Sequence, residues 1–207
     1  MSKFSFYVAL IHYPVLNKEG RIIASSTTNL DLHDIARACR TYGVKRYYVV
    51  QPLRTQRKLI TELLEYWQKG AGRVYNPDRQ EALKILRVVP ALAVALREIE
   101  EETTSPVLIG TDARPEYATL TYGEARKRLE GGGSYLLLLG TAWGLAPKLL
   151  ANCDFVLEPI KGCAGDGYNH LSVRSAAAII LDRLLGEPWW KSLKEEEDVS
   201  RDQRDRK

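Results

Sequence analysis

The sequence predicts an α/β fold, in which helices flank a parallel sheet. The first observation is that apolar runs at 4–11 and 45–50 enclose a segment with the apolar period of a helix. A strand–helix–strand unit with short links favours parallel strands and a right-handed crossover. The second is that two later apolar runs, at 107–111 and 135–140, reach a glycine where they end, which permits close approach of the backbone to a neighbour or a ligand.

The elements follow from local patterns. Aromatic and β-branched residues mark the strands, and capping residues before an apolar stripe mark the helix starts. In the first half we expect a strand at 4–11, a turn at 17–20, a helix at about 30–42, a strand at 45–50, a helix at about 55–69, a polar break at 70–76, a helix at 78–86 and a short strand at 88–89.

The second half continues the alternation. We expect a helix at 92–102, a strand at 107–111, a helix at 122–129, a strand at 135–139, a short helical piece after Pro147, a strand at 155–157 and an apolar helix at 171–185. No internal repeat is present, so one domain is expected over residues 1–190. Residues 191–207 are nearly all charged and are expected to form a disordered tail.

The composition is that of a globular protein, with 45% hydrophobic residues and a net charge of +4. A mildly basic chain permits a polyanionic partner without requiring one. Cys39, Cys153 and Cys163 form no C-x-x-C pair, so neither a disulfide framework nor a zinc site is expected, and no other metal site is indicated. Neither a signal peptide nor a membrane-spanning segment is visible, which predicts a cytoplasmic protein without a membrane partner.

Two glycine-containing loops follow neighbouring predicted strands near the end of the chain, at 140–147 and 159–170. The carboxyl ends of parallel strands meet at one edge of a sheet, where open α/β sheets bind ligands. The second loop enters the last helix through Asn169-His170-Leu171-Ser172, and a helix start offers free backbone N–H groups. A ligand site is therefore predicted at this edge; a mobile surface loop is the alternative.

These loops resemble the paired C-terminal motifs of the SPOUT RNA methyltransferases. The resemblance rests on Gly140-Thr141-x-x-Gly144-Leu145, Pro159-Ile160-x-Gly162 and the segment 169–173, and it extends over about residues 4–190. The whole chain also resembles a less characterised SPOUT group, found alone or joined to the bacterial tRNA guanine-N1 methyltransferase. The resemblance implies a C-terminal trefoil knot, S-adenosyl-L-methionine as the methyl donor, a homodimer, and RNA (tRNA or rRNA) as acceptor.

The same motifs imply which residues contact the methyl donor. For Leu145, Ile160 and Leu171, packing in the core explains the apolar side chain equally well. The residues expected to bind the donor are Gly110, Thr111, Gly140, Thr141, Gly144, Leu145, Ile160, Gly162, His170, Leu171 and Ser172.

Three residues are candidates for catalysis. Arg37 precedes Gly43 by six positions, like the motif 1 arginine of the ribose-methylating SPOUT enzymes, and a guanidinium suits phosphate; an exposed helix arginine is the alternative. Asp166 resembles the loop aspartate that acts as base in the guanine-N1 enzyme, although Asp-Gly is also ordinary turn chemistry. Asn169 is the third candidate, and whether it or Ser172 carries the family role, or caps the helix, stays open.

Two positions depart from the ribose-methylating pattern. Asp31 stands where an asparagine is usual, and Ala142 where a glutamate is usual, so the acceptor atom stays open. The predicted function is in-line transfer of a methyl group to RNA. The alternatives are a non-catalytic module that binds the methyl donor and an ordinary doubly wound domain that binds a nucleotide. The latter lacks a G-x-G-x-x-G or G-x-x-x-x-G-K-[ST] motif after the first strand.

Overall fold

Six parallel strands form the central sheet in the computed structural model, which describes residues 4–166 and 168–187. The strand order is β5-β4-β1-β7-β6-β8. The strands are β1 (Phe4–Ile11), β4 (Arg46–Val50), β5 (Leu86–Val89), β6 (Val107–Thr111), β7 (Gly133–Gly140) and β8 (Phe155–Leu157); β2 (Val15–Leu16) and β3 (Ile22–Ile23) form a separate antiparallel hairpin.

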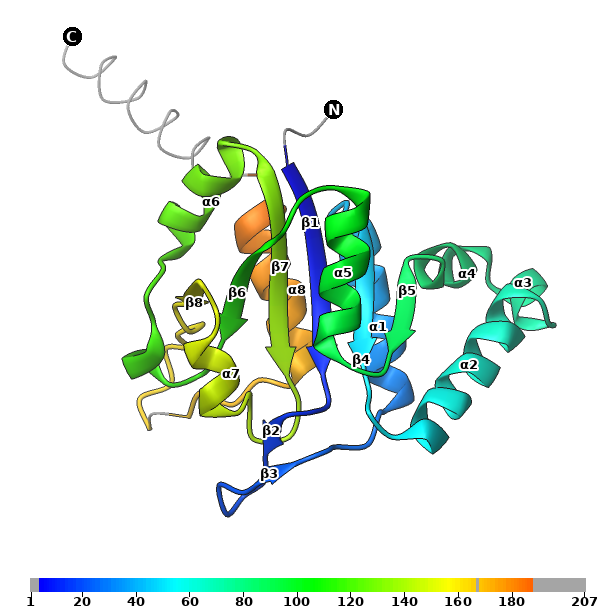
Figure 1. Ribbon diagram of the computed structural model, residues 1–207, viewed down its shortest axis with the longest axis horizontal. Coiled ribbons are helices and arrows are strands. Elements are labelled where there is room, and N and C mark those ends of the chain that lie inside the picture. The colour runs from blue at the N-terminus through cyan, green and yellow to red at the C-terminus, as the bar shows by residue number, and fades with distance from the viewer. Residues whose placement is uncertain (1–3, 167, 188–207) are drawn as a thin grey trace, which may run out of the picture.

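Helices cover both faces of the sheet (Figure 1), as the sequence predicts for an α/β protein. The helices α1 and α8 lie behind the sheet in this view, whereas α5 and α7 lie in front. The helices are α1 (Asn29–Thr41), α2 (Arg54–Gln68), α3 (Gly72–Tyr75), α4 (Pro77–Leu83), α5 (Leu92–Glu102), α6 (Tyr122–Glu130), α7 (Pro147–Ala151) and α8 (Val173–Leu185), with a 3-10 turn at Pro115–Tyr117.

Strand β1 is the centre of the sheet because its residues are apolar on both faces. It pairs in parallel with β4, with Ala9 opposite Tyr48, and with β7, with Ala9 opposite Leu138. The side chains of β1 alternate between two apolar cores: Val8 and Leu10 face α1 and α8, and their neighbours face α5 and α7. Burial on both faces explains why this strand is a continuous apolar run.

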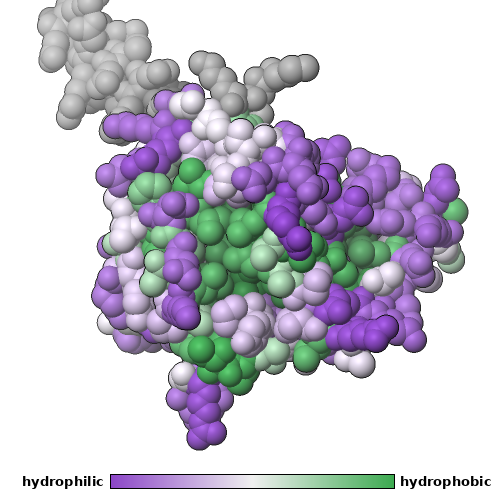
Figure 2. All heavy atoms as spheres, in the orientation of Figure 1, coloured by the Kyte–Doolittle hydropathy of each residue, from purple (hydrophilic) through white to green (hydrophobic). Residues whose placement is uncertain are grey.

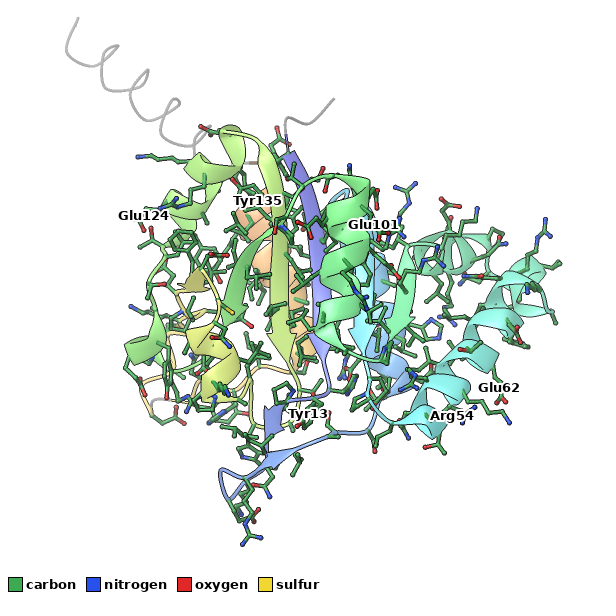
Figure 3. The ribbon with its side chains drawn as sticks, viewed as in Figure 1. Tyr13, Arg54, Glu62, Glu101, Glu124 and Tyr135 are labelled. Carbon is green, nitrogen blue, oxygen red and sulfur yellow. The ribbon has the colours of Figure 1, made fainter. Side chains whose placement is uncertain are left out.

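The connections place a ligand site beside β1. From β1 the chain runs outward through β4 to β5, then crosses by α5 to β6 and returns by α6 to β7 at the other side of β1. The loops after β1 and β7 pair with each other at the carboxyl edge of the sheet, with Val15 opposite Leu145, and the crevice opens beside them at the ends of β7, β6 and β8. Figure 3 shows Tyr13 at this edge beside β2, and Tyr135 toward the opposite edge.

Most predicted elements are confirmed, and the differences are local. The helix predicted at 78–86 ends at Leu83, because Leu86 pairs with Tyr47 and begins β5. The last helix begins at Val173 instead of 171, with Ser172 as its N-cap. The hairpin β2–β3 and the short helix α3 were not predicted, since neither has a periodic apolar pattern.

The predicted tail at 191–207, and the predicted domain end at 190, lie outside the described residues. Within the described part of the chain, no helix is both long and apolar enough to cross a membrane.

Candidate functional site

A cleft of about 960 Å³ opens at the carboxyl edge of the sheet. Its walls come from the ends of β6, β7 and β8, the hairpin β2–β3, and the first turns of α1 and α8. The cleft is lined by apolar side chains such as Leu139, Leu157 and Ile160, with polar groups at its rim. This combination of apolar walls and a few polar groups is typical of a small-molecule site.

Most of the predicted donor-binding and catalytic residues reach this cleft. Those that line it are Thr111, Gly140, Thr141, Gly144, Ile160, Asn169, His170, Leu171 and Ser172. Those outside its lining are Gly110, Leu145, Gly162, Arg37 and Asp166. The structure thus brings the two predicted loops and the start of the last helix together around one cavity.

Packing explains two of the residues outside the lining. A Cβ on Gly110 would lie 3.0 Å from Leu150 Cδ2 and 3.1 Å from Cys153 Sγ, so the missing side chain lets α7 pack on β6. Leu145 is fully buried in the core beneath α5 and α7. For Leu145 the core-packing interpretation therefore holds, whereas Ile160 and Leu171 face the cleft.

The turn after β7 needs glycine at two positions. A Cβ on Gly140 would lie 2.7 Å from the Leu145 backbone nitrogen, a distance that real Cβ atoms do not adopt. Gly144 has φ +96°, and Ala142, at φ 53°, also has a left-handed backbone. The Gly144 N–H donates to Thr141 O over 3.0 Å. The glycines therefore fold the turn tightly back on the strand end.

A buried polar network fixes the wall of the cleft. The Thr141 hydroxyl donates to Ile11 O over 2.9 Å, so at the 2.6 Å contact between Ser25 and Thr141 the Ser25 hydroxyl is the donor. Ser25 then accepts from His12 Nδ1 at 2.9 Å, and His12 Nε2 accepts from Thr27 at 3.2 Å. Each hydroxyl proton of Thr141, Ser25 and Thr27 and the one ring proton of His12 thus has an acceptor in this row of hydrogen bonds. With a single ring proton, on Nδ1, His12 is neutral.

Burial agrees with a neutral His12. The ring is fully buried, and desolvation lowers its pKa from 6.5 to about 4, although the nearby Asp31 carboxylate raises it. The network continues to α2, because Gln51 Nε2 donates to Ser25 O and the Gln56 side chain accepts from Thr27 N. Segment 25–27 of the wall is thus held from both the sheet and α2.

Two ion pairs stand at the cleft. Arg174, in the first turn of α8, binds the nearly buried Asp31 of α1 at 2.8 Å. Arg114 binds Asp112, just after β6, through two parallel hydrogen bonds of 2.8 Å, and its guanidinium stacks 4.5 Å from the Tyr117 ring centre. The hydrogen bonds to Asp112 raise the pKa of the Arg114 guanidinium. The Arg114 guanidinium therefore remains charged at the cleft.

The loop at 159–170 is closed by one side chain. Asn169 donates to Ile160 O at 2.8 Å and accepts from Gly162 N at 3.3 Å. Asp166 is exposed and accepts from Tyr168 N at 3.0 Å, the turn chemistry expected of an Asp-Gly pair. Arg37 is exposed on α1. The catalytic roles of these residues stay predictions.

Sequence reasoning missed several residues of the cleft. Ser25, Asp112, Arg114, Trp143 and Arg174 line it but were not named as site residues. The sequence signals that could have found some of them were the position of Asp112 and Arg114 directly after a glycine-containing strand and the position of Trp143 inside the predicted loop 140–147. Among the described residues, no group of three histidine, cysteine or acidic side chains has the arrangement of a metal site.

The chain belongs to a family of SAM-dependent RNA methyltransferases, whose family model matches residues 5–186. SAM is S-adenosyl-L-methionine, the methyl donor named in the description of this family. The resemblance to the SPOUT enzymes is thereby confirmed, and the ordinary nucleotide-binding domain is disfavoured.

Curated relatives show the same relationship at high identity. The chain is 48% identical over 184 residues to a tRNA (guanine-N(1)-)-methyltransferase of Oleidesulfovibrio alaskensis, a match that spans 88% of this chain and 42% of that protein. It is 44% identical over 181 residues to an uncharacterized protein of Aquifex aeolicus, over 86% of this chain and 87% of that one. The chain thus spans less than half of the first relative and most of the second.

Solved structures support the fold. A probable methyltransferase from Bordetella pertussis aligns with a TM-score of 0.55 at 19% identity, over 88% of this chain and 92% of its own. TrmJ from Z. mobilis aligns with a TM-score of 0.54 at 16% identity, over 89% and 70% of the two chains. At these identities the likeness shows a shared α/β architecture.

Proposed function

We propose that the protein transfers a methyl group from S-adenosyl-L-methionine to a nucleotide of tRNA or rRNA. The observation that supports this most strongly is the cleft of about 960 Å³ at the carboxyl edge of the sheet, in a chain of this methyltransferase family. The loops that line it carry nine of the residues predicted for the donor site and for catalysis.

The cleft fits a nucleoside-containing donor. Leu139, Leu157 and Ile160 supply apolar walls for a purine ring, and the tight Gly140 turn exposes backbone rather than side chain to it. Thr111 and Ser172 also line the cleft, where the Thr111 hydroxyl donates to Leu138 O and the Ser172 hydroxyl accepts from Ser175 N. S-adenosyl-L-methionine, when bound, supplies a methyl group activated by its sulfonium. The chain's part is to orient the acceptor in line and to keep water away.

The acceptor must also lose a proton. We assign this role to Asp166, a carboxylate in the loop that borders the cleft. Asn169 already uses both ends of its amide on Ile160 and Gly162. It therefore positions the loop in this proposal, and Arg37 contacts phosphate of the acceptor RNA.

The last part of the proposal concerns the oligomeric state and the path of the C-terminal segment. We infer a homodimer whose C-terminal segment is threaded as a trefoil knot, as the resemblance implies. Both the dimer and the knot rest on that resemblance alone.

Incubation with labelled donor and total RNA tests the function. We expect label in a single methylated nucleoside, identified by mass spectrometry after digestion, and loss of that nucleoside from cells that lack the protein. Binding of S-adenosylhomocysteine without transfer to any tRNA or rRNA would contradict the proposal.

A further inference from the structure

Trp143 is an exposed tryptophan on the wall of the cleft. Its side chain is 61% accessible, although it lines the same cavity as the buried Leu139. Its ring makes no aromatic or cation–π contact with the described part of the chain. The ring therefore stands at the cleft with its face free to contact a bound molecule.

The backbone holds Trp143 in this position. It follows Ala142, whose φ of 53° is unusual for a residue with a side chain, and precedes Gly144, with φ +96°. The Trp143 N–H donates to Leu16 O over 3.1 Å, and the Leu16 N–H donates to Gly144 O over 3.0 Å. The turn is therefore bound to strand β2, and the indole is presented by a fixed backbone.

The hairpin beside Trp143 carries positive charge. Lys18 lines the cleft and, like Arg21, forms no ion pair with any residue that the structure describes; Glu19 lies between them. Asn17 fixes the tip by accepting from the backbone N–H groups of Glu19 and Arg21. Figure 2 shows this hydrophilic tip below a hydrophobic base. An aromatic face on the same cleft as a lysine suits a base with its phosphate.

We propose that Trp143 is a stacking platform for an unpaired nucleobase of the acceptor RNA, with Lys18 near the adjoining phosphate. The proposal rests on the proposed function, and it adds the form of the acceptor. A base can stack on an open aromatic face only when it is unstacked from its neighbours, as in RNA loops. The enzyme is therefore expected to select a single-stranded or splayed-out nucleotide.

The test measures binding of a fluorescent single-stranded RNA octamer of random sequence, with saturating S-adenosylhomocysteine. Trp143→Phe keeps an aromatic face, Trp143→Leu keeps apolar bulk alone, and Trp143→Ala removes both. We expect the Trp143→Phe variant to retain the wild-type Kd for RNA within about threefold. The Leu and Ala variants are expected to bind RNA about fivefold to a hundredfold more weakly. Tyr75→Ala, at an 83% exposed tyrosine of α3, is the matched control and is expected to change nothing.

Several outcomes would overturn the stacking platform. If the Trp143→Leu variant binds RNA as tightly as the Trp143→Phe variant does, the aromatic face has no role. If Trp143→Ala weakens S-adenosylhomocysteine and RNA alike, the indole belongs to the donor site. If wild type methylates RNA and Trp143→Ala does so with the same KM, the proposed function stands and this inference alone fails. A wild-type protein that neither binds nor methylates RNA refutes both.

Discussion

At the scale of single residues, His12 shows how a buried polar side chain shapes a site without touching a ligand. Its two ring nitrogens join Ser25 and Thr27, and Ser25 joins Thr141 of the turn after β7. A buried network is favourable only when every member has its partner. Here each proton has one acceptor, so a change at His12 disturbs the wall of the cleft.

Acid is expected to weaken the fold through His12. Its pKa is about 4 in the folded protein and about 6.5 when unfolded, so between these values the unfolded chain binds more protons. Stability linked to His12 is complete above pH 6.5 and is lost as pH falls toward 4, by roughly 3 kcal/mol in total. Denaturant unfolding of wild type and His12→Asn across this range measures it. An unfolding free-energy difference between them that is independent of pH would contradict the assignment.

Asp166→Asn tests the base. Because an amide cannot accept the acceptor's proton, we expect kcat to fall by about a hundredfold or more, with the Kd of S-adenosylhomocysteine unchanged. Asp78→Asn, in the exposed first turn of α4, is the control. Turnover that persists in Asp166→Asn would remove the residue from the mechanism.

At the scale of elements, the glycine that ends a strand has different uses in different strands. Gly110 makes room for α7, whereas Gly140 makes room for the backbone of its own turn. Both were predicted as contacts of the methyl donor: Gly140 because it belongs to the motif that resembles the SPOUT enzymes, and Gly110 because it ends the preceding strand. Only the group packed against each glycine distinguishes them. For Gly110 it is Leu150, 40 residues later in the sequence, and for Gly140 it is Leu145, 5 residues later.

Gly140→Ala is expected to damage the site. The new Cβ would meet main-chain atoms of Gly144 and Leu145 at 2.7–3.0 Å, and backbone cannot yield as a flexible side chain can. We expect a loss of about 1–3 kcal/mol in stability and at least about a tenfold weaker Kd for S-adenosylhomocysteine, measured by denaturation and calorimetry. Gly123→Ala, in α6 with no atom within 4 Å of the new Cβ, is the matched control and should stabilise by about 0.4–1 kcal/mol. Equal effects of the two changes would refute the steric explanation.

At the scale of the whole molecule, the crossover from β5 to β6 decides where the site lies. It places β7 next to β1, so that Thr141 meets Ser25, 116 residues earlier in the chain. Arg37 is exposed on α1 and outside the cleft of its own chain. We therefore infer that Arg37 contacts a phosphate of RNA bound at the cleft of a second copy of the chain.

Subunit mixing tests this shared site. We expect wild type to have twice the 23.4 kDa mass of the chain in light scattering, and Arg37→Ala and Gly140→Ala each to transfer methyl groups much more slowly than wild type when the donor concentration is close to the wild-type Kd. A mixed dimer retains one site with an intact cleft and an intact arginine, so mixing the two variants should restore methyl transfer. A monomeric wild type, or a mixture without activity, would contradict the shared site.

The sequence by itself determined the kind of fold, the position of nearly every strand and helix, and the loops that form the cleft. It did so because apolar period, caps and strand-ending glycines act over a few residues. Tertiary structure alone decided which side chains meet there. Asp31 and Arg174, 143 residues apart, form an ion pair, and Trp143 stands exposed on a turn held by Leu16. Such contacts depend on strand order and on the closing of long loops, which no local pattern encodes.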